Sequence, residues 1–250
     1  MSHLAWLLVL ALVGGACAQT GPAVPSGSGA IVRLSPELTV RSPAPRVYVV
    51  THDRPYPANS VVVEARDGTL VLVGSPYTAE ATRVVLAWLQ RKFGARRRVA
   101  IDTHFHEDAG IGGNPVYREA GIPIYGSELT VGLLAERTPG AVPPDHVFPL
   151  ERGLELDFGE PVKVAFPGPG HSRDNVVVHF PSERLLVGGC LVKAGDAIGN
   201  TADADLPRWA SSVRGLASYD VDWIVPGHGE RLDRGLIAHT IEVVSAALAK

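Results

Sequence analysis

Two kinds of apolar pattern alternate along this chain. Short runs rich in Val, Ile and Leu, bounded by Gly, Pro, Asp or Ser, predict strands, and longer segments with an apolar residue every three or four positions predict amphipathic helices. The predicted strands are 47–51, 60–65, 69–73, 99–101, 162–166, 175–180, 185–187 and 223–225. The predicted helices are 79–93, 127–137, 206–218 and 236–248. Ser127 is expected to cap the second helix, and Asp203 and Asp205 are expected to cap the third.

Two strand-turn-strand segments resemble each other. One runs from Asn59 to Gly74 and the other from Asn175 to Gly188. If they are repeats, each half of the chain contributes one sheet, the helices lie outside, and a site lies along the shared edge. Chance likeness between two valine-rich hairpins is the alternative. The fold class that we expect is α/β, of a layered α+β type.

Length and charge limit the class of protein. The 250 residues, 46% of them hydrophobic, suit one large domain with a substantial core. Trp88 and Trp209 fall on helical faces and are expected in that core. The formal net charge of -3 gives no general attraction to nucleic acid or to an anionic membrane. We expect a monomer with no nucleic-acid partner and no stable membrane span.

The N-terminal residues have the pattern of an export signal. The apolar run 4–13 is too short for a bilayer span, which takes about 20 residues, and it leads to Ala-Cys-Ala, so we expect cleavage after Ala18. A lipid anchor on Cys17 is the alternative, but Gly14 stands where that signal usually has a larger aliphatic residue. The expected location is the periplasm. The predicted parts of the chain are a signal peptide at 1–18, a flexible leader at 19–29 and a folded domain at 30–250.

Cys190 is the only cysteine that remains once the signal is removed. No intramolecular disulfide is then possible, and a lone thiol in an oxidising compartment is buried or bound to a metal. Burial alone is the simpler interpretation of a cysteine that follows Leu-Leu-Val-Gly-Gly. The histidines elsewhere in the chain favour a thiolate ligand.

Six residues with metal-binding side chains lie between the apolar runs, and the last three of them stand in glycine-rich turns. These residues are His104, His106, Asp108, His171, Cys190 and His228. Six ligands are too many for one tetrahedral zinc ion but suit two, each with three protein ligands and room for solvent. Three histidines resemble the ligand set of carbonic anhydrase, whereas Asp, Cys and His make a softer second group. A hydroxide shared by the two ions would attack at neutral pH, because zinc lowers the pKa of bound water to about 7.

The ordered set of motifs resembles subclass B1 metallo-beta-lactamases over nearly all of the chain after the signal. The motifs are the His-x-His-x-Asp loop that ends at Asp108, Gly170-His171-Ser172, Gly188-Gly189-Cys190-Leu191-Val192-Lys193, Gly199-Asn200 and Gly227-His228. The resemblance implies a four-layer αββα sandwich with a di-zinc groove between its sheets. It implies one zinc ion on His104, His106 and His171, and a second on Asp108, Cys190 and His228.

Three residues have further roles by the same resemblance. Lys193 matches the family's lysine for the substrate carboxylate, and Asn200 matches a residue that helps to polarise the lactam carbonyl. Asp108 would orient the attacking hydroxide as well as bind zinc. An ordinary exposed lysine, and an asparagine that only supports the turn after Gly199, are the alternatives. The reaction implied is hydrolysis of the beta-lactam ring of antibiotics by a metal-bound hydroxide, which confers antibiotic resistance.

The chain departs from its relatives at a few positions. Ala109 stands where glyoxalase II and subclass B3 enzymes have histidine, which favours B1, although many B1 members have a basic residue there. Many also have Asp in the turn where this chain has Gly74 and Ser75, so we expect Ser75 to replace that carboxylate in part. The segment 52–59 corresponds to the hairpin loop over the groove. In it Tyr56 is either a hydrophobic wall or part of a plain surface turn.

Two other functions remain open. A hydrolase of the same fold acting on another ester, thioester or phosphoester would keep the metals but would not need Lys193. A non-enzymatic periplasmic zinc binder would be expected to close its coordination shell rather than leave positions for solvent.

Overall fold

The computed structural model describes residues 29 and 31–249. The predicted signal peptide, the Cys17 anchor and almost all of the predicted leader therefore lie outside the described residues.

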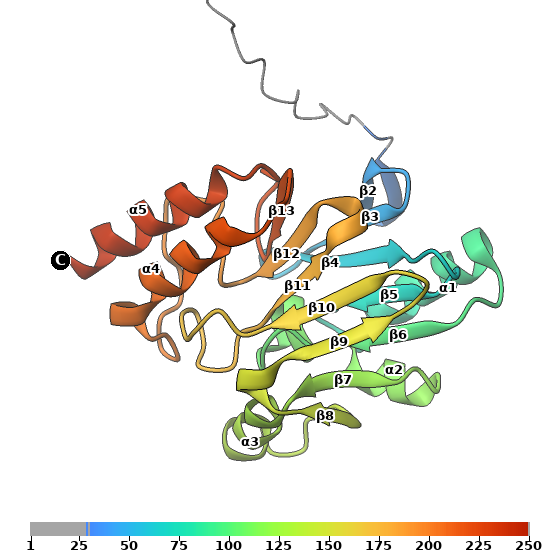
Figure 1. Ribbon diagram of the computed structural model, residues 1–250. Coiled ribbons are helices and arrows are strands. Elements are labelled where there is room, and N and C mark those ends of the chain that lie inside the picture. The colour runs from blue at the N-terminus through green and yellow to red at the C-terminus, as the bar shows by residue number, and fades with distance from the viewer. Residues whose placement is uncertain (1–28, 30, 250) are drawn as a thin grey trace, which may run out of the picture.

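The described strands form two sheets (Figure 1). In spatial order, the first contains β1 (Val32–Ser35), β2 (Leu38–Ala44), β3 (Val47–Asp53), β4 (Pro57–Glu64), β5 (Leu70–Val73), β6 (Arg98–Ile101), β7 (Ile124–Ser127) and β8 (His146–Phe148). The second contains β13 (Trp223–Pro226), β12 (Leu185–Gly189), β11 (Val177–Phe180), β10 (Pro161–Ala165) and β9 (Leu154–Asp157). The α-helices are α1 (Ala79–Phe93), α2 (Asn114–Glu119), α3 (Glu128–Arg137), α4 (Leu206–Gly215) and α5 (Leu236–Leu248).

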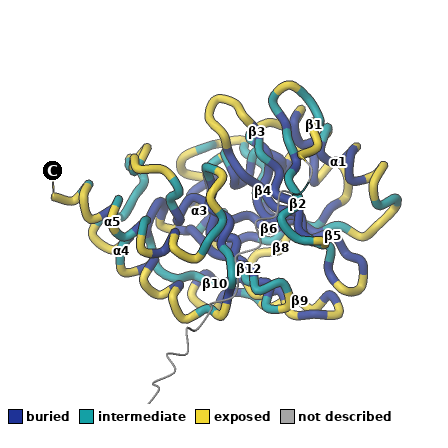
Figure 2. The backbone as a smooth tube through the Cα atoms, turned by 90° about the horizontal axis from the view of Figure 1, so that it is seen from above, coloured by how far each residue is buried: buried dark blue, intermediate teal, exposed yellow. Residues whose placement is uncertain are grey.

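The two sheets pack face to face, with helices on their outer sides. Successive side chains of a strand point to opposite faces, so Val47 and Val49 of β3 lie in the core between the sheets, whereas Tyr48 and Val50 pack under α1. The second sheet fills the central core from the other side and packs its outer face against α4 and α5 (Figure 1). The strands are mostly buried, and exposed residues lie on the outer helices and loops (Figure 2). The molecule is therefore an αββα sandwich, as the resemblance implied.

Each half of the chain builds one sheet. The two similar segments form the antiparallel pairs β4–β5 and β11–β12, and a parallel strand, β6 or β13, follows each pair. The sheets differ in size, because the first has eight strands and the second has five. The layered fold with one sheet from each half is confirmed.

All the predicted helices and strands are present, with small shifts at their ends. The helix predicted to end at Ser218 is α-helical to Gly215 and continues as one 3-10 turn. The sequence did not predict β1, β2, β7, β8, β9 or the short helix α2. Within 31–249 no helix is long and apolar enough to cross a membrane.

Candidate metal centre

The six candidate ligands lie just beyond the ends of strands. The chain leaves β6 and enters the loop that carries His104, His106 and Asp108, and β12 ends next to Cys190. His228 follows β13, and His171 lies in the loop between β10 and β11. Loops anchored on a rigid sheet bring distant side chains to one place. The structure collects these six residues into two groups of three.

The first group consists of His104, His106 and His171. Their ligand nitrogens lie within 4.8 Å of one another, and Nδ1 of His106 is 3.0 Å from Nε2 of His171. The rings meet edge to face, with ring centres 4.9, 5.3 and 4.9 Å apart. Three ring nitrogens thus point into one small space, as a three-histidine zinc site requires.

Thr103 fixes the orientation of His104. The Thr103 hydroxyl donates to the carbonyl oxygen of Ala109 at 3.0 Å, so it accepts a hydrogen bond from Nδ1 of His104, also at 3.0 Å. The lone pair of His104 is then on Nε2. This atom is buried and has no hydrogen-bond partner in the described part of the chain. A buried nitrogen without a partner is costly, and a metal ion would satisfy it.

Asp203 fixes His106 in a similar way. Nε2–H of His106 donates to Oδ2 of Asp203 at 3.1 Å, which leaves Nδ1 facing His171. The other oxygen of Asp203 lies 3.9 Å from Nη1 of Arg137. The expectation that Asp203 caps α4 is wrong, because the N-cap is Asp205. Asp203 lies two residues before that cap, and its carboxylate turns to the metal site instead.

The second group consists of Asp108, Cys190 and His228. Nε2 of His228 lies 3.0 Å from Oδ2 of Asp108 and 3.5 Å from Sγ of Cys190. Nδ1–H of His228 donates to the carbonyl oxygen of Pro57 at 2.7 Å, so Nε2 is the nitrogen left for a metal. A carboxylate, a sulfur and an imidazole at these positions suit zinc.

Burial and charge set the protonation of these groups. Burial lowers the pKa of His104 and of His171 well below the usual value, and neighbouring positive charges lower it further, so both rings are neutral and able to bind a metal. Burial raises the pKa of Asp108, but the hydrogen bond from His228 and the nearby histidines lower it by more. Burial lowers the pKa of His228, but its hydrogen bonds with Asp108 and Cys190 raise it by more. The second group therefore favours a positive charge at its centre.

Two glycines allow the loops to approach so closely. A Cβ on Gly227 would lie 2.5 Å from Sγ of Cys190, and a Cβ on Gly74 would lie 2.1 Å from the carbonyl oxygen of Ala109. Gly74 also has a φ of 65°, in the left-handed region that favours glycine. Any side chain at either position would push a ligand loop away from the site.

Ser75 acts on the loop backbone. Its hydroxyl donates to the carbonyl oxygen of Gly110 at 3.1 Å and accepts from the amide of Gly113 at 2.7 Å. Both partners belong to the turn that follows Asp108. Ser75 thus supports the backbone of the ligand loop. This is the position at which Ser75 was expected to replace a carboxylate in part.

A groove of about 860 Å³ lies over both groups of ligands. Tyr56, which is 64% exposed, and Pro57 line it from the β3–β4 hairpin, as expected of a wall. Lys193 and Asn200 line it from the long loop after β12. The side-chain oxygen of Asn200 accepts a hydrogen bond from the amide of Ala202 at 3.0 Å, so only its NH₂ group is left for a substrate. The asparagine therefore supports its own turn and also faces the groove.

Lys193 is held in place by two helices. Its Nζ lies 5.2 Å from the ring centre of Trp209 on α4, and its backbone amide donates to Oγ1 of Thr240 on α5 at 2.9 Å. Trp209 is fully buried, as expected, but it also supports a groove residue. Burial lowers the pKa of Lys193 by more than the charges of Cys190 and Asp108 raise it. An ammonium group fixed at the groove suits capture of a carboxylate.

Sequence patterns did not indicate Thr103, Asp203 or Thr240 as parts of the site. Asp203 is 97 residues from His106 and Thr240 is 47 residues from Lys193, so no local spacing reveals these contacts. Thr103 lies next to the predicted ligand His104. A hydroxyl beside a ligand was the one feature of the sequence that could have indicated the role of Thr103.

The ligand atoms of the two groups are better satisfied by metal ions than by contacts with one another. Nδ1 of His106 and Nε2 of His171 are 3.0 Å apart, Nε2 of His104 has no partner among the described residues, and the second group favours a cation. Two three-ligand groups on one groove of an αββα sandwich form the kind of site that metal-dependent hydrolases use.

Comparison with known proteins gives the family. The family model described as metallo-beta-lactamase superfamily matches residues 53–228, a range that contains all six candidate ligands. This chain belongs to the metallo-beta-lactamase superfamily, whose members take a divalent metal, usually zinc, and its resemblance to the subclass B1 enzymes is confirmed.

The relatives cover most of the chain. The metallo-beta-lactamase type 2 of Bacillus cereus is 37% identical over 193 residues, which are 75% of this chain and 73% of that protein. The metallo-beta-lactamase type 2 of Elizabethkingia meningoseptica is 29% identical over 255 residues, with 98% and 96% covered. A solved metallo-beta-lactamase from Pontibacter korlensis superposes with a TM-score of 0.76 at 33% identity, covering 83% of this chain and 99% of that one. One from Erythrobacter litoralis has a TM-score of 0.76 at 28% identity, covering 86% and 99%.

Proposed function

We propose that this protein hydrolyses the amide bond of beta-lactam antibiotics with two zinc ions. One observation carries the proposal: both three-ligand groups open on a single groove that also presents Lys193. The names of the relatives support the same substrate class. Lys193 distinguishes a lactamase from a zinc hydrolase whose substrate has no carboxylate.

In the proposed complex His104, His106 and His171 would hold one ion, and Asp108, Cys190 and His228 the other. When bound, zinc supplies Lewis acidity toward a carbonyl group and makes water more acidic. The residues of the chain supply geometry and proton handling. Thr103, Asp203 and the Pro57 carbonyl keep one nitrogen of each of three ligand histidines protonated, so that the other nitrogen faces the metal.

The substrate would be bound by groups on both walls of the groove. Lys193 would bind the carboxylate that beta-lactams carry beside the lactam nitrogen, and the NH₂ group of Asn200 would face the lactam carbonyl. Tyr56 and Phe105 supply apolar surface in the same groove. Asp108, which is ionised, would orient the attacking water and carry a proton toward the leaving nitrogen.

A chromogenic cephalosporin tests this proposal with the full protein. Ring opening should stop when a chelator is added and should return with zinc. Cys190→Ser should retain the fold, as judged by circular dichroism, and should lose at least about tenfold in kcat/KM, since even the partners of metal ligands are worth that much. Chelator-resistant ring opening, or none with zinc present, would contradict the proposal.

The same assay separates the other functions. Zinc-dependent hydrolysis of thioesters or phosphoesters without ring opening would indicate a different hydrolase of this fold. Tight zinc binding without any turnover would indicate a zinc binder.

Export and antibiotic resistance are further parts of the proposal. The apolar N-terminal run and the Ala-Cys-Ala pattern support secretion to the periplasm with cleavage after Ala18. Expression of the full chain in a bacterial host, with the N-terminus read by mass spectrometry, tests both. We expect a mature chain that begins at Gln19 and a raised inhibitory concentration of penicillins. Retention in the cytoplasm, or an unchanged inhibitory concentration despite active protein, would contradict this part.

A further inference from the structure

A second hollow lies next to the groove and shares two walls with it. Its volume is about 410 Å³. Phe105 and Asp203 line both spaces, and Asp203 also bonds to the ligand His106. The rest of the lining comes from α3, the loop after His171, the segment that leads into α4 and the first turn of α4. A substrate in the groove therefore has the hollow beside it, separated by one side chain from the first group of ligands.

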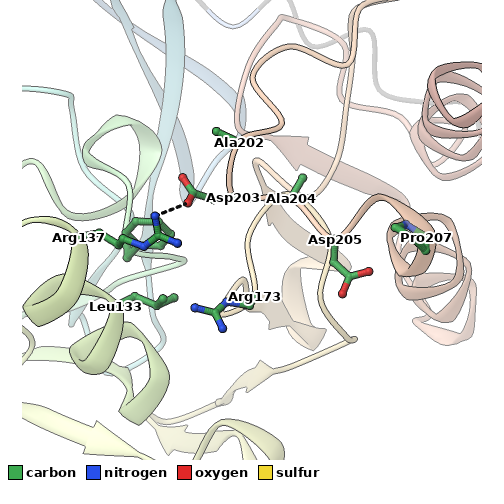
Figure 3. A pocket seen from close by; sticks show the side chains of 9 residues that line it. Leu133, Arg137, Arg173, Ala202, Asp203, Ala204, Asp205 and Pro207 are labelled. Atoms are coloured by element: carbon green, nitrogen blue, oxygen red, sulfur yellow. Dashed lines mark ion pairs between the residues drawn. The ribbon is translucent and has the colours of Figure 1, made fainter. Parts of the chain in front are cut away.

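Two arginines from different elements face this hollow. Arg137 comes from the end of α3, and Arg173 comes from the loop two residues after His171. Figure 3 shows the Arg173 side chain pointing into the hollow toward the side where Leu133 and Arg137 lie. Arg137 is paired with Glu136 at 3.1 Å and with Asp203 at 3.9 Å, so an anion in the hollow would meet chiefly the charge of Arg173.

The acidic groups of the hollow are already engaged. Asp205 accepts two hydrogen bonds from the guanidinium of Arg208 and one from its amide. Asp203 lies between His106 and Arg137. Arg173 forms no hydrogen bond or ion pair with the described residues, so its charge is the unmatched one in this hollow.

We propose that this hollow is a subsite for a negatively charged group on the side chain of the substrate. The inference rests on the proposed function, since it concerns what a beta-lactam carries beyond its ring. Arg173 presents a planar fork of donors, the arrangement that binds a carboxylate or sulfonate through two hydrogen bonds. Phe105, Leu133 and Pro207 supply apolar surface for the part of the side chain that carries the charge. Substrates with a second acidic group are therefore preferred over their uncharged counterparts.

The test compares benzylpenicillin with its α-carboxybenzyl analogue, which differs by one carboxylate. The quantity measured is the ratio of kcat/KM for the charged substrate to kcat/KM for the uncharged one, since a general effect of a mutation cancels in this ratio. Arg173→Gln should lower the ratio about threefold, the size expected of a solvent-exposed ion pair, and Arg173→Glu should lower it further. Added salt should reduce the ratio in the wild type, because it screens exposed charges. Arg152→Gln is the matched control, since Arg152 is exposed and does not line the hollow.

Each outcome has one meaning. An unchanged ratio in both Arg173 variants, or an equal fall in Arg152→Gln, would overturn the subsite while leaving lactam hydrolysis intact. If benzylpenicillin itself is not hydrolysed, the proposed function fails and this inference fails with it.

Discussion

In three of the candidate ligand histidines, a hydrogen bond holds the ring nitrogen that points away from the metal site. Each of the three bonds is made with a different kind of group. A hydroxyl holds His104, a carboxylate holds His106 and a backbone carbonyl holds His228. Each contact selects the tautomer whose free lone pair points into a ligand group. Outer partners of this kind commonly change metal affinity 10- to 100-fold when they are removed.

Asp203→Asn tests this role at one ligand. An amide can still contact His106, but it no longer supplies the charge that makes the imidazole a better donor, so zinc affinity should fall about tenfold. Competition with a chromophoric chelator measures this affinity without relying on turnover. Asp205→Asn is the control, because Asp205 caps α4 and should leave zinc affinity unchanged. Equal affinities for the wild type and Asp203→Asn would contradict the role.

At this scale the sequence predicted the six candidate ligands, which the structure brings together in two groups, but only part of what surrounds them. The candidate ligands are rare side chains, three of them stand in glycine-rich turns, and their order along the chain is distinctive. Asp203 looked like a helix cap because capping is a local pattern, whereas its bond to His106 spans 97 residues. The carbonyl of Pro57 is a backbone group 171 residues from His228, and no side-chain pattern can indicate it.

At the scale of elements, short contacts between loops and helices set the position of the site. The turn after β5 supports the loop that carries Asp108, since Gly74 lies against Ala109 and Ser75 bonds to Gly110 and Gly113. On the opposite wall, α5 supports Lys193 through Thr240, which is fully buried. Each of these contacts leads to a separate prediction.

Gly74→Ala should displace the loop that carries Asp108. The added Cβ would meet a backbone oxygen, and alanine is disfavoured at the positive φ of Gly74, so we expect a loss of about 1–3 kcal/mol in the free energy of unfolding. Zinc binding by the second group should weaken. Denaturant unfolding and a zinc titration of the same variant measure the two effects. Gly132→Ala on α3 is the control, because nothing lies within 4 Å of its added Cβ. A Gly74→Ala protein as stable as the wild type would contradict this account.

Thr240→Val should weaken substrate binding. Valine keeps the shape but removes the acceptor for the partly buried Lys193 amide, and an amide left without a partner there costs up to about 1–3 kcal/mol. We expect KM for a chromogenic cephalosporin to rise severalfold while kcat changes little, together with a lower melting temperature. A variant that loses stability with an unchanged KM would show that α5 does not position Lys193.

Most of the elements that sequence patterns missed have weak apolar patterns or are short. β1, β8 and β9 are edge strands, so their residues alternate only weakly between buried and exposed or are mainly exposed. β2 contains Arg41 and Pro43, and α2 has only six residues. The strands found from the sequence are interior ones, except for the edge strand β13, and most of them have nearly continuous apolar runs that reflect burial on both faces.

At the scale of the whole molecule, an ion-pair cluster joins the two sheets. Arg46, between β2 and β3, donates to Glu160 at 2.7 Å and also bonds to Glu183, so a turn of the first sheet is tied to two turns of the second. Glu160 has a side-chain exposure of only 4%. Burial raises the pKa of Glu160, but hydrogen bonds from Arg46 and Ser182 and nearby positive charges lower it by more, so the pKa lies below the usual 4.5.

This shift makes the stability depend on pH. A carboxylate whose folded pKa is depressed stabilises the fold above the unfolded pKa, and this contribution is lost as pH falls through the folded pKa. Glu160→Gln should therefore cost about 1–3 kcal/mol at pH 7, and its difference from the wild type should shrink below about pH 4.5. Urea unfolding of the metal-free protein across this pH range measures the difference. Glu155→Gln, which removes an exposed pair with Lys163, should have almost no effect. A Glu160→Gln difference that stays constant into acid would contradict the shift.

The overall architecture was the part most accessible from sequence. The two valine-rich hairpins predicted one sheet from each half, and the motifs predicted the layers. The unequal sizes of the sheets were not predicted, since the additional strands of the first sheet include the edge strands with weak patterns.

The most direct test of the account is the amount of zinc bound per chain. Its central claim is that the two groups of three ligands are separate metal sites on one groove. Elemental analysis after equilibration with zinc and removal of the excess should give two zinc ions per chain for the wild type and one for Cys190→Ser. Two ions in Cys190→Ser, or fewer than two in the wild type at saturating zinc, would contradict it.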